Sequence, residues 1–105
     1  MKIKIFLLST IILMLFLSCI NEMARNKIKQ DEYKGIIVDK YKESINHDAR
    51  TFMILIDNNN YETSAEFWPY AWEYASVGDS IIKPKDELKI IIKKKDGSSD
   101  VFFYQ

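Results

Sequence analysis

The sequence LKIIIKKKDGSSDVFF, residues 88–103, indicates the fold class more directly than any other stretch of the chain. Asp96-Gly97 is a strong signal for a two-residue type I′ turn between antiparallel strands. That turn pairs Lys93 with Asp100. One face of the hairpin is then entirely apolar and carries Ile90, Ile92, Val101 and Phe103. Because a slip of one residue would turn this face outward, we expect a β-hairpin with a defined register.

More strands precede this hairpin. β-branched and apolar runs bounded by polar residues predict strands over residues 34–41, 51–57, 61–64 and 80–83. Asn58-Asn59 suits the turn between the second and third strands, because asparagine tolerates positive φ. This turn sets Ile56 opposite Tyr61. The chain is therefore predicted to be mainly β.

An aromatic segment, residues 63–78, lies between the third strand and the short fourth one. Thr63 and Glu66 have the spacing of a capping box, and Gly78 suits the left-handed residue beyond a helix end. Pro69 cannot donate an amide hydrogen bond, so regular helix can begin near it. We expect one helix here.

The apolar side chains of this helix cover too wide an arc to be buried on one face. They sweep roughly 220°, whereas a surface helix buries an arc little wider than about 100°. One flank is therefore expected to stay partly exposed, either Trp68 with Trp72 or Tyr70 with Val77. Aromatic residues anchor many binding surfaces, so the candidate binding residues are Trp68, Tyr70 and Trp72. If loops or the N-terminal linker cover the flank, they are core residues instead.

The order strand, strand, strand, helix, strand, hairpin resembles the OB-fold, with residues 80–83 as an extra or split strand. The resemblance implies a small OB-like β-barrel; a small SH3-like barrel or a sheet with one packed helix is the alternative. Residues 34–104 also resemble small uncharacterised bacterial lipoproteins, through VGDSIIK at 77–83 and the turn Asn46-His47. Both resemblances imply a fold and no activity.

The first nineteen residues have the three parts of an export signal. Lys2 and Lys4 give a basic start, Ile5 to Leu17 is a run of 13 uncharged residues, and Ser18-Cys19 follows. As a helix the run reaches about 20 Å, short of the ~30 Å hydrocarbon core of a bilayer. Export is therefore favoured over a permanent membrane span.

The end of this signal, Leu17-Ser18-Cys19, resembles the lipobox of bacterial lipoproteins. The resemblance implies cleavage before Cys19 and attachment of lipid to its sulfur and new amino group. Cys19 is the only cysteine, so no internal disulfide can form, and lipidation gives this thiol a use. The alternatives are an uncleaved anchor or an ordinary secretory signal. The expected parts are a signal peptide (1–18), a lipidated cysteine with a flexible tether (19–33) and a β-barrel domain (34–105).

Composition limits the function. Without Lys2 and Lys4 the chain has 13 basic and 15 acidic residues, a net charge of −2, which argues against nucleic-acid binding. The single histidine, single cysteine and three glycines make no catalytic, metal-binding or phosphate-binding motif. His47 and Asp48 with Asp39 could hold a divalent ion, but a solvated turn is favoured. No enzyme activity, metal or cofactor is expected.

These observations favour a monomeric lipoprotein of the bacterial cell envelope, on its periplasmic or surface face, held by lipid on Cys19. It would bind a protein or a glycan through the aromatic helix. The alternative is a structural envelope lipoprotein without a ligand, and a small hydrolase is a distant third.

We predict that Cys19→Ala moves the protein out of the membrane fraction, because two or three acyl chains hold a protein on a bilayer where one would not. Fractionation of cells followed by immunoblotting measures this. A variant that still pellets with membranes after a high-salt wash would contradict lipid anchoring.

Overall fold

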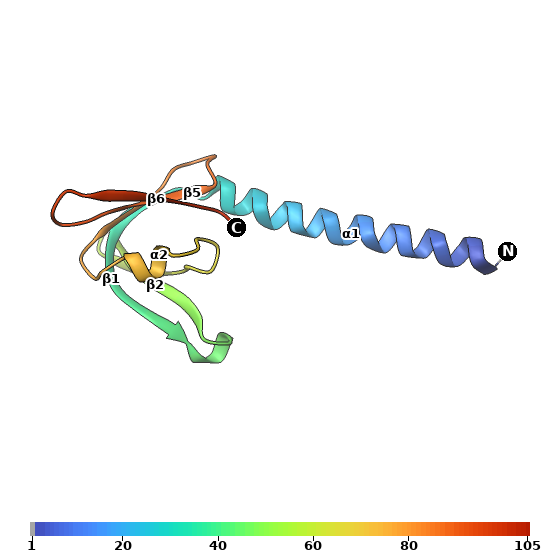
Figure 1. The fold of residues 1–105 in the computed structure, drawn as a ribbon, viewed down its shortest axis with the longest axis horizontal. Coiled ribbons are helices and arrows are strands. Elements are labelled where there is room, and N and C mark those ends of the chain that lie inside the picture. The colour runs from blue at the N-terminus through green and yellow to red at the C-terminus, as the bar shows by residue number, and fades with distance from the viewer. Residues whose placement is uncertain (1) are drawn as a thin grey trace. The chain divides into compact units, whose positions relative to one another are not determined.

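The computed structural model describes the backbone of residues 2–105 and the side chains of residues 11–15 and 19–105 (Figure 1). The chain divides into two compact parts, which meet between Gln30 and Asp31. All buried apolar side chains among those described belong to residues 31–105. This second part therefore contains a complete core of its own and can fold without the first.

The first part is helix α1 (Lys2–Gln30), which leaves Cys19 exposed. The sequence predicts a flexible tether after the cysteine, but the helix continues to Gln30. Residues 2–30 contain neither Gly nor Pro, and residues 20–30 are rich in good helix formers. The side chains of residues 1–10 and 16–18, which form most of the expected signal, lie outside the described ones. No helix among the described residues is both long and apolar enough to cross a membrane.

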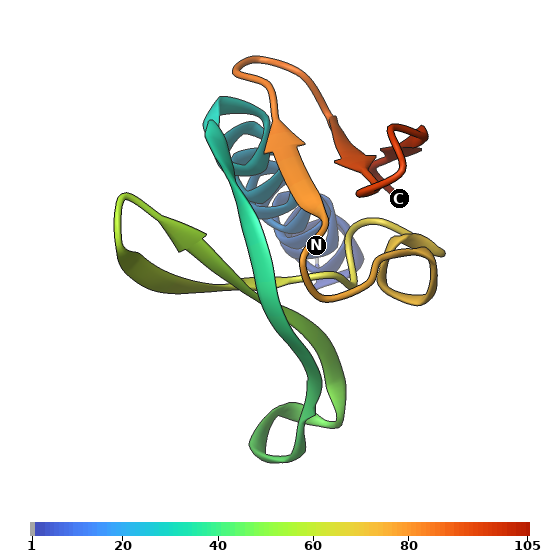
Figure 2. The same cartoon turned by 90° about the vertical axis from the view of Figure 1, so that its left-hand side faces the viewer.

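The second part is one open sheet of six antiparallel strands in the order β3-β2-β1-β4-β5-β6 (Figure 2). The strands are β1 (Tyr33–Glu43), β2 (Ala49–Ile56), β3 (Asn59–Ser64), β4 (Ser80–Lys83), β5 (Lys89–Lys93) and β6 (Ser99–Phe103). A 3-10 turn η1 (Ser44–Asn46) follows β1, and a single helical turn α2 (Ala71–Tyr74) lies between β3 and β4. The predicted mainly β fold and its order of elements are confirmed. Among the described strands, no pairing of β3 with β6 closes the sheet into a barrel.

Strand β1 is shared by both halves of the sheet. It pairs with β2 along most of its length and, through Tyr33–Ile36, with β4. A bulge between Ile37 and Asp39 bends it, as extra residues in a ladder do. Beyond the last β4 pair, the N–H of Ile37 donates to the Asp79 carbonyl at 2.8 Å, and the N–H of Gly78 donates to the Ile37 carbonyl at 2.7 Å. The chain entering β4 is thus fixed to the bend.

The core lies on the inner face of the sheet, beneath the β3–β4 connection that carries α2 (Figure 1). The fully buried apolar side chains of the sheet are Ile37, Phe52, Ile54, Ile81, Ile90 and Ile92. The connection covers them with Ala65, Trp68, Ala71 and Ala75. Burial of apolar area on this face is the main stabilising contribution to the domain.

The turn between β2 and β3 differs from the predicted one by two residues in register. Asp57 and Asn58 hold positive φ angles of 50° and 66°, and Ile56 pairs with Asn59 rather than Tyr61. Aspartate tolerates the left-handed region as asparagine does, so a two-residue turn could form either at Asp57-Asn58 or at Asn58-Asn59. A shift of two residues leaves every side chain on the same face. The hydrophobic pattern could therefore not choose between them.

The β5–β6 hairpin differs from the predicted register by one residue. Ile90 pairs with Phe102, not Phe103. The loop has three residues, with Gly97 at φ 93° and its N–H bonded to the Lys94 carbonyl, which is a type I turn with a glycine bulge. The prediction that Val101 and Phe103 face the core is therefore wrong, because their exposed fractions are 38% and 65%.

The predicted helix is also much shorter than the aromatic segment. Thr63 lies in β3, and the Glu66 carboxylate accepts from the N–H of Arg50 at 2.6 Å instead of closing a capping box. Only Ala71–Tyr74 is α-helical, since Pro69 and a left-handed Tyr70 precede it. Gly78 has the expected positive φ, at 97°.

We predict that Gly35→Ala lowers the free energy of unfolding by about 1–3 kcal/mol, the usual range for overpacking. A Cβ at position 35 would overlap Ile54 Cγ2 and lie 2.6 Å from the Leu55 carbonyl oxygen, a backbone atom that cannot turn aside. Urea unfolding of residues 31–105 measures the change. Gly97→Asn is the matched control, because nothing lies within 4 Å of a Cβ there and asparagine tolerates positive φ. Equal losses in both variants would contradict the close approach at Gly35.

Candidate binding site

The three predicted binding residues differ in exposure, and so do the two flanks of the predicted helix. Trp68 is only 3% exposed and belongs to the core. Trp72 is partly buried; its ring N–H donates to the Thr51 carbonyl at 3.2 Å, and its ring lies 4.5 Å from the Lys40 ammonium. Tyr70 and Val77 are 81% and 52% exposed. Of the two flanks left open by the sequence, the one with Tyr70 and Val77 is exposed.

The Tyr70 side chain is exposed, and its backbone has an unusual conformation. Its φ and ψ are 70° and −9°, in the left-handed region that bulky residues rarely occupy. That conformation costs roughly 1–2 kcal/mol in a residue with a Cβ. Strained backbone of this kind is found preferentially at functional sites. Folding alone would favour glycine or asparagine here.

Tyr70 borders a pocket of about 360 Å³ beside the free edge of β6. The pocket is lined by Pro69, Tyr70, Asp100, Val101, Phe102, Phe103 and Gln105. It is thus an apolar hollow with one carboxylate and one amide at its margin. We call it the Tyr70 pocket.

The register of β6 decides which backbone groups face this edge. The Lys94 N–H donates to the Ser98 carbonyl, and the Tyr104 N–H donates to the Leu88 carbonyl. Antiparallel pairs alternate between bonded and non-bonded, so alternate residues of β6 direct their N–H and C=O groups away from β5; they are Ser99, Val101 and Phe103. The Val101 N–H is already bonded to the Asp100 carboxylate at 2.9 Å. The edge beside Phe103 remains open to an added strand.

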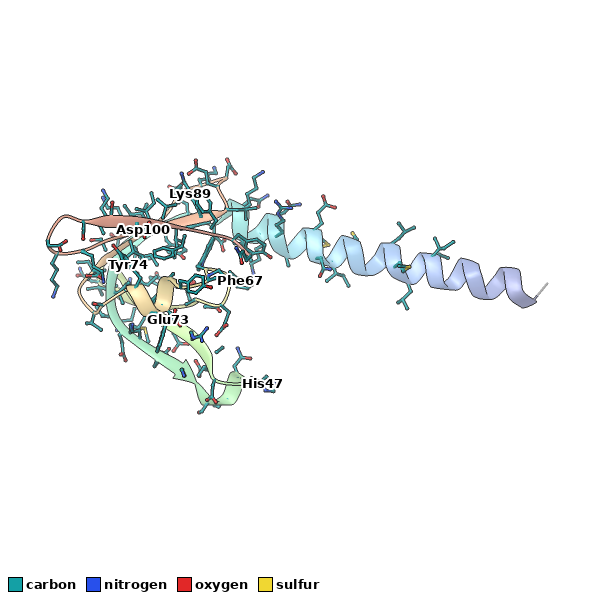
Figure 3. All side chains as sticks on the ribbon, in the orientation of Figure 1. His47, Phe67, Glu73, Tyr74, Lys89 and Asp100 are labelled. Carbon is teal, nitrogen blue, oxygen red and sulfur yellow. The ribbon has the colours of Figure 1, made fainter. Side chains whose placement is uncertain are left out.

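Aromatic contacts hold the loop that carries Tyr70. The Phe67 ring, labelled in Figure 3, stacks on Tyr104 with centroids 5.9 Å apart. Trp68 meets the same Tyr104 ring edge-on at 6.2 Å. The N–H of Gln105 donates to the Phe67 carbonyl at 3.1 Å. Residues 67–70 are therefore fixed against the end of β6, and the Tyr70 pocket has two firmly held walls.

Two lysines bind the carbonyl end of α2. The Lys40 ammonium donates to the carbonyls of Trp72 and Ala75, the latter at 2.8 Å. Burial lowers the pKa of Lys40, partly opposed by the Glu73 carboxylate. The Lys94 ammonium donates to the Tyr74 carbonyl. Cations at a helix C-terminus satisfy carbonyls that have no partner within the helix, so these lysines stabilise a helix too short to persist alone.

Lys94 also pairs with a buried carboxylate. Asp79 is 2% exposed; it accepts from the Lys94 ammonium and from the N–H of Ser76, each at 2.8 Å. Burial alone would raise the pKa of Asp79, but the hydrogen bonds from Lys94 and Ser76 outweigh burial and hold this pKa below its usual value. The pair connects the β4 entry to the end of β5.

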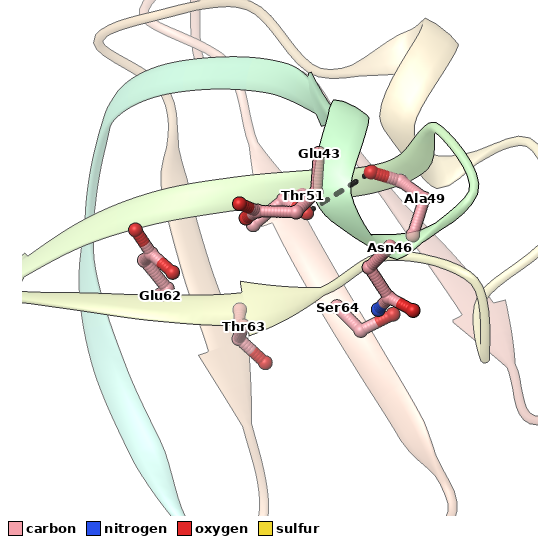
Figure 4. Close-up of a pocket in the computed structure, with 7 residues that line it drawn as sticks. All are labelled: Glu43, Asn46, Ala49, Thr51, Glu62, Thr63 and Ser64. Atoms are coloured by element: carbon pink, nitrogen blue, oxygen red, sulfur yellow. Dashed lines mark hydrogen bonds between the residues drawn. The ribbon is translucent and has the colours of Figure 1, made fainter.

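A second, polar pocket of about 210 Å³ lies near η1 (Figure 4). It is lined by Glu43, Asn46, Ala49, Thr51, Glu62, Thr63 and Ser64. The nearby Tyr41 hydroxyl is buried, and no described residue lies at a normal hydrogen-bond distance and angle from it. The Glu62 carboxylate is close enough to raise the pKa of Tyr41 to about 12. Its lining combines two carboxylates with three hydroxyl groups and contains no histidine, cysteine or lysine.

Lys83 is another buried ionisable group. The Lys83 side chain is 1% exposed, and its ammonium donates to the carbonyls of Asp31 at 2.8 Å and Pro84 at 2.6 Å. Burial lowers the pKa of Lys83, opposed most by Asp31. His47 and Asp48 both have positive φ in the turn after η1. No three metal-ligating side chains come together among the described residues.

Sequence reasoning missed the charged residues that build this region. Lys40, Asp79, Lys83 and Lys94 lie in runs that look solvated, and only the fold brings Lys40 and Lys94 to one helix end. The one available signal was Asp79 directly after Gly78, an acid at the start of an apolar strand. Phe103 was placed in the core because of the one-residue register error.

We predict that Lys94→Met lowers the free energy of unfolding at pH 7 by about 3 kcal/mol, the low end for breaking a buried ion pair. The low end applies because the Lys94 side chain keeps 21% exposure, while that of Asp79 keeps 3%. Urea unfolding measures the loss, with Lys85→Met as a control that removes the same charge from an exposed residue in the loop after β4.

The loss should shrink in acid. The pKa of Asp79 is lower in the folded state than its usual 3.8, so its contribution is present above pH 3.8 and is lost as the pH falls through the folded value. Unfolding at pH 7 and at pH 3 tests this. A difference between wild type and Lys94→Met that stays constant over this range would contradict the ion pair.

No protein-family model, no curated protein and no solved structure matches this chain significantly. The physical features described above are therefore the basis for any functional inference.

Proposed function

We propose that this chain is a lipid-anchored module of the bacterial cell envelope that binds another protein without catalysing a reaction. Its anchor is Cys19, and its binding surface is the Tyr70 pocket. A structural envelope lipoprotein without a ligand is the competing function.

The anchor is supported by the basic start, the apolar run and the Leu17-Ser18-Cys19 sequence at its end. Exposure of Cys19 agrees with a thiol that is open to modification. The complete core within residues 31–105 agrees with a domain that stays folded after the signal is removed.

The single observation that carries the binding function is Tyr70, an aromatic side chain 81% exposed on a left-handed backbone. A position selected for stability alone would avoid both the strain and the exposed ring. Tyrosine is among the residues that contribute most to binding energy at interfaces. Tyr70 also borders a pocket of about 360 Å³, large enough for one or two side chains of a partner.

A protein segment fits this pocket better than a glycan does. The edge of β6 offers backbone N–H and C=O groups to an added strand, and Phe103 with Tyr70 offers apolar contact to alternate side chains of such a strand. Addition of a strand to a free sheet edge is a common mode of peptide recognition. Side-chain hydrogen bonds to sugar hydroxyls could use Tyr70, Asp100 and Gln105, and Asp100 is already bonded to the Val101 N–H.

We also propose that the domain is a variant of the OB-like barrel, or alternatively of an SH3-like one, in which a loop replaces the closing strand pair. The hydrogen bond from Gln105 to Phe67 joins the segment after β3 to the end of β6, the two edges of the open sheet. This contact supports closure by residues 65–70.

We predict that Tyr70→Gly keeps or raises the melting temperature yet abolishes capture of the partner. Glycine relieves the left-handed strain, while the lost ring was almost fully exposed. Trp72→Ala is the contrasting variant; truncating a largely buried tryptophan costs about 3–5 kcal/mol. Differential scanning calorimetry measures the first effect.

Capture is measured by placing a photo-crosslinking amino acid at position 105, which also lines the Tyr70 pocket, in the full chain in its native envelope, with and without Tyr70→Gly. Tyr61, 52% exposed on the opposite edge strand, is the matched control position. A discrete protein adduct from position 105, absent at the control position and lost in Tyr70→Gly, supports the proposal. No adduct from either position would favour the structural role, and an adduct containing glycan would replace the protein partner.

A further inference from the structure

The outer face of β4, β5 and β6 points away from the core. Ile81, Ile90 and Ile92 are fully buried, and successive side chains of a strand alternate between faces. The residues between these isoleucines therefore lie on the outer face, and the strand register places residues of β1 and β6 beside them. The residues of this outer face are Lys34, Ile36, Ser80, Ile82, Lys89, Ile91, Lys93, Ser99, Val101 and Phe103. We call this surface the basic face.

The basic face is apolar along its middle and positive around it. Ile91 pairs with Ile82 on one side and with Val101 on the other, which makes a continuous apolar row. Ile36, 47% exposed, lies in the neighbouring row. The basic residues of the face are Lys34, Lys89 and Lys93; Lys89 is labelled in Figure 3.

No acidic side chain lies on the basic face among the described residues. Strands β4 and β5 contain no Asp or Glu, and Asp100 of β6 pairs with the buried Ile92, so it belongs to the opposite face. The nearest ion pair joins Lys89 to Glu87 in the preceding loop at 3.7 Å. Both side chains are partly exposed, so this pair neutralises Lys89 little.

Two acidic residues lie on the outer face of the other half of the sheet. Asp39 and Glu62 both pair with Met53, one from β1 and one from β3, and therefore share a face there. The bulge in β1 separates these two residues from the basic face. A chain with equal numbers of acidic and basic residues thus presents a locally positive, partly apolar surface.

We infer that the basic face rests on an anionic lipid surface. Lysine ammonium groups attract anionic headgroups, and an apolar row between them can bury area at the headgroup boundary. A second copy of this chain is a poorer occupant. A two-fold dimer brings the same patch of both copies together, so the lysines of one face would meet the lysines of the other.

This inference rests on the proposed function in one respect, the anchor that keeps the domain near a membrane. The chain from Cys19 to Tyr33 reaches roughly 20 Å as a helix. A domain tethered this closely has a high effective concentration at the surface, so even weak binding fixes its orientation.

The test uses unlipidated residues 31–105 with vesicles of phosphatidylcholine, either alone or mixed with phosphatidylglycerol, in sedimentation at low and high salt. We expect binding to the anionic vesicles at low salt only. Replacing three lysines together (Lys34→Gln, Lys89→Gln, Lys93→Gln) should weaken it on the order of 100-fold, about fivefold for each lysine. The matched control replaces three exposed lysines outside the face (Lys42→Gln, Lys85→Gln, Lys95→Gln).

Three results would overturn the inference. They are absence of binding to anionic vesicles at low salt, equal weakening in both triple variants, and a dimer in solution that Ile36→Ser dissociates. None of them involves Cys19 or Tyr70, so failure here leaves the anchor and the Tyr70 pocket untouched. Conversely, an unmodified Cys19 in native material would remove the anchor without changing the vesicle result.

Discussion

The double pairing of β1 is the constraint on which the rest of the domain depends. Among the described strands it alone joins the β2–β3 hairpin to the β4–β6 half. Gly35 lets β1 lie against the backbone of β2, and the bulge after Ile37 turns the strand. Because the backbone of Ile37 also bonds to Gly78 and Asp79, the bend fixes the position of the chain that enters β4.

A short series of polar contacts connects the bend in β1 to the candidate site beside α2. Asp79 is held inside the domain, where its carboxylate must be paired, and Lys94 pairs with it. The same ammonium binds the end of α2, which Lys40 binds from β1. The single turn of α2 is therefore held by charges from two strands, and Tyr70 directly precedes it. The exposed tyrosine depends on a buried ion pair.

The domain presents two surfaces of different chemistry. The Tyr70 pocket combines exposed aromatic rings with a free strand edge, which suits a protein segment. The basic face combines lysines with an apolar row, which suits anionic headgroups. They share only Val101 and Phe103 at the edge of β6. A domain resting on its basic face would therefore hold its binding edge close to the membrane surface.

The amino-acid sequence by itself determined the strand content, the order of elements, the presence of a turn (not its type) around Asp96-Gly97 and the positive φ of Gly78, because each depends on residues close together in the chain. It also indicated that one aromatic flank would be exposed. The tertiary structure decided which flank, since burial of Trp68 depends on contact with Tyr104 near the end of the chain. The tertiary structure also decided the strand registers. Two possible turn positions after β2 bury the same side chains, so the sequence pattern could not separate them. In the last hairpin, a glycine bulge shifts the pairing of β6 by one residue. The pairing of Asp79 with Lys94 joins residues that only the folded sheet brings together, so no local pattern could reveal it.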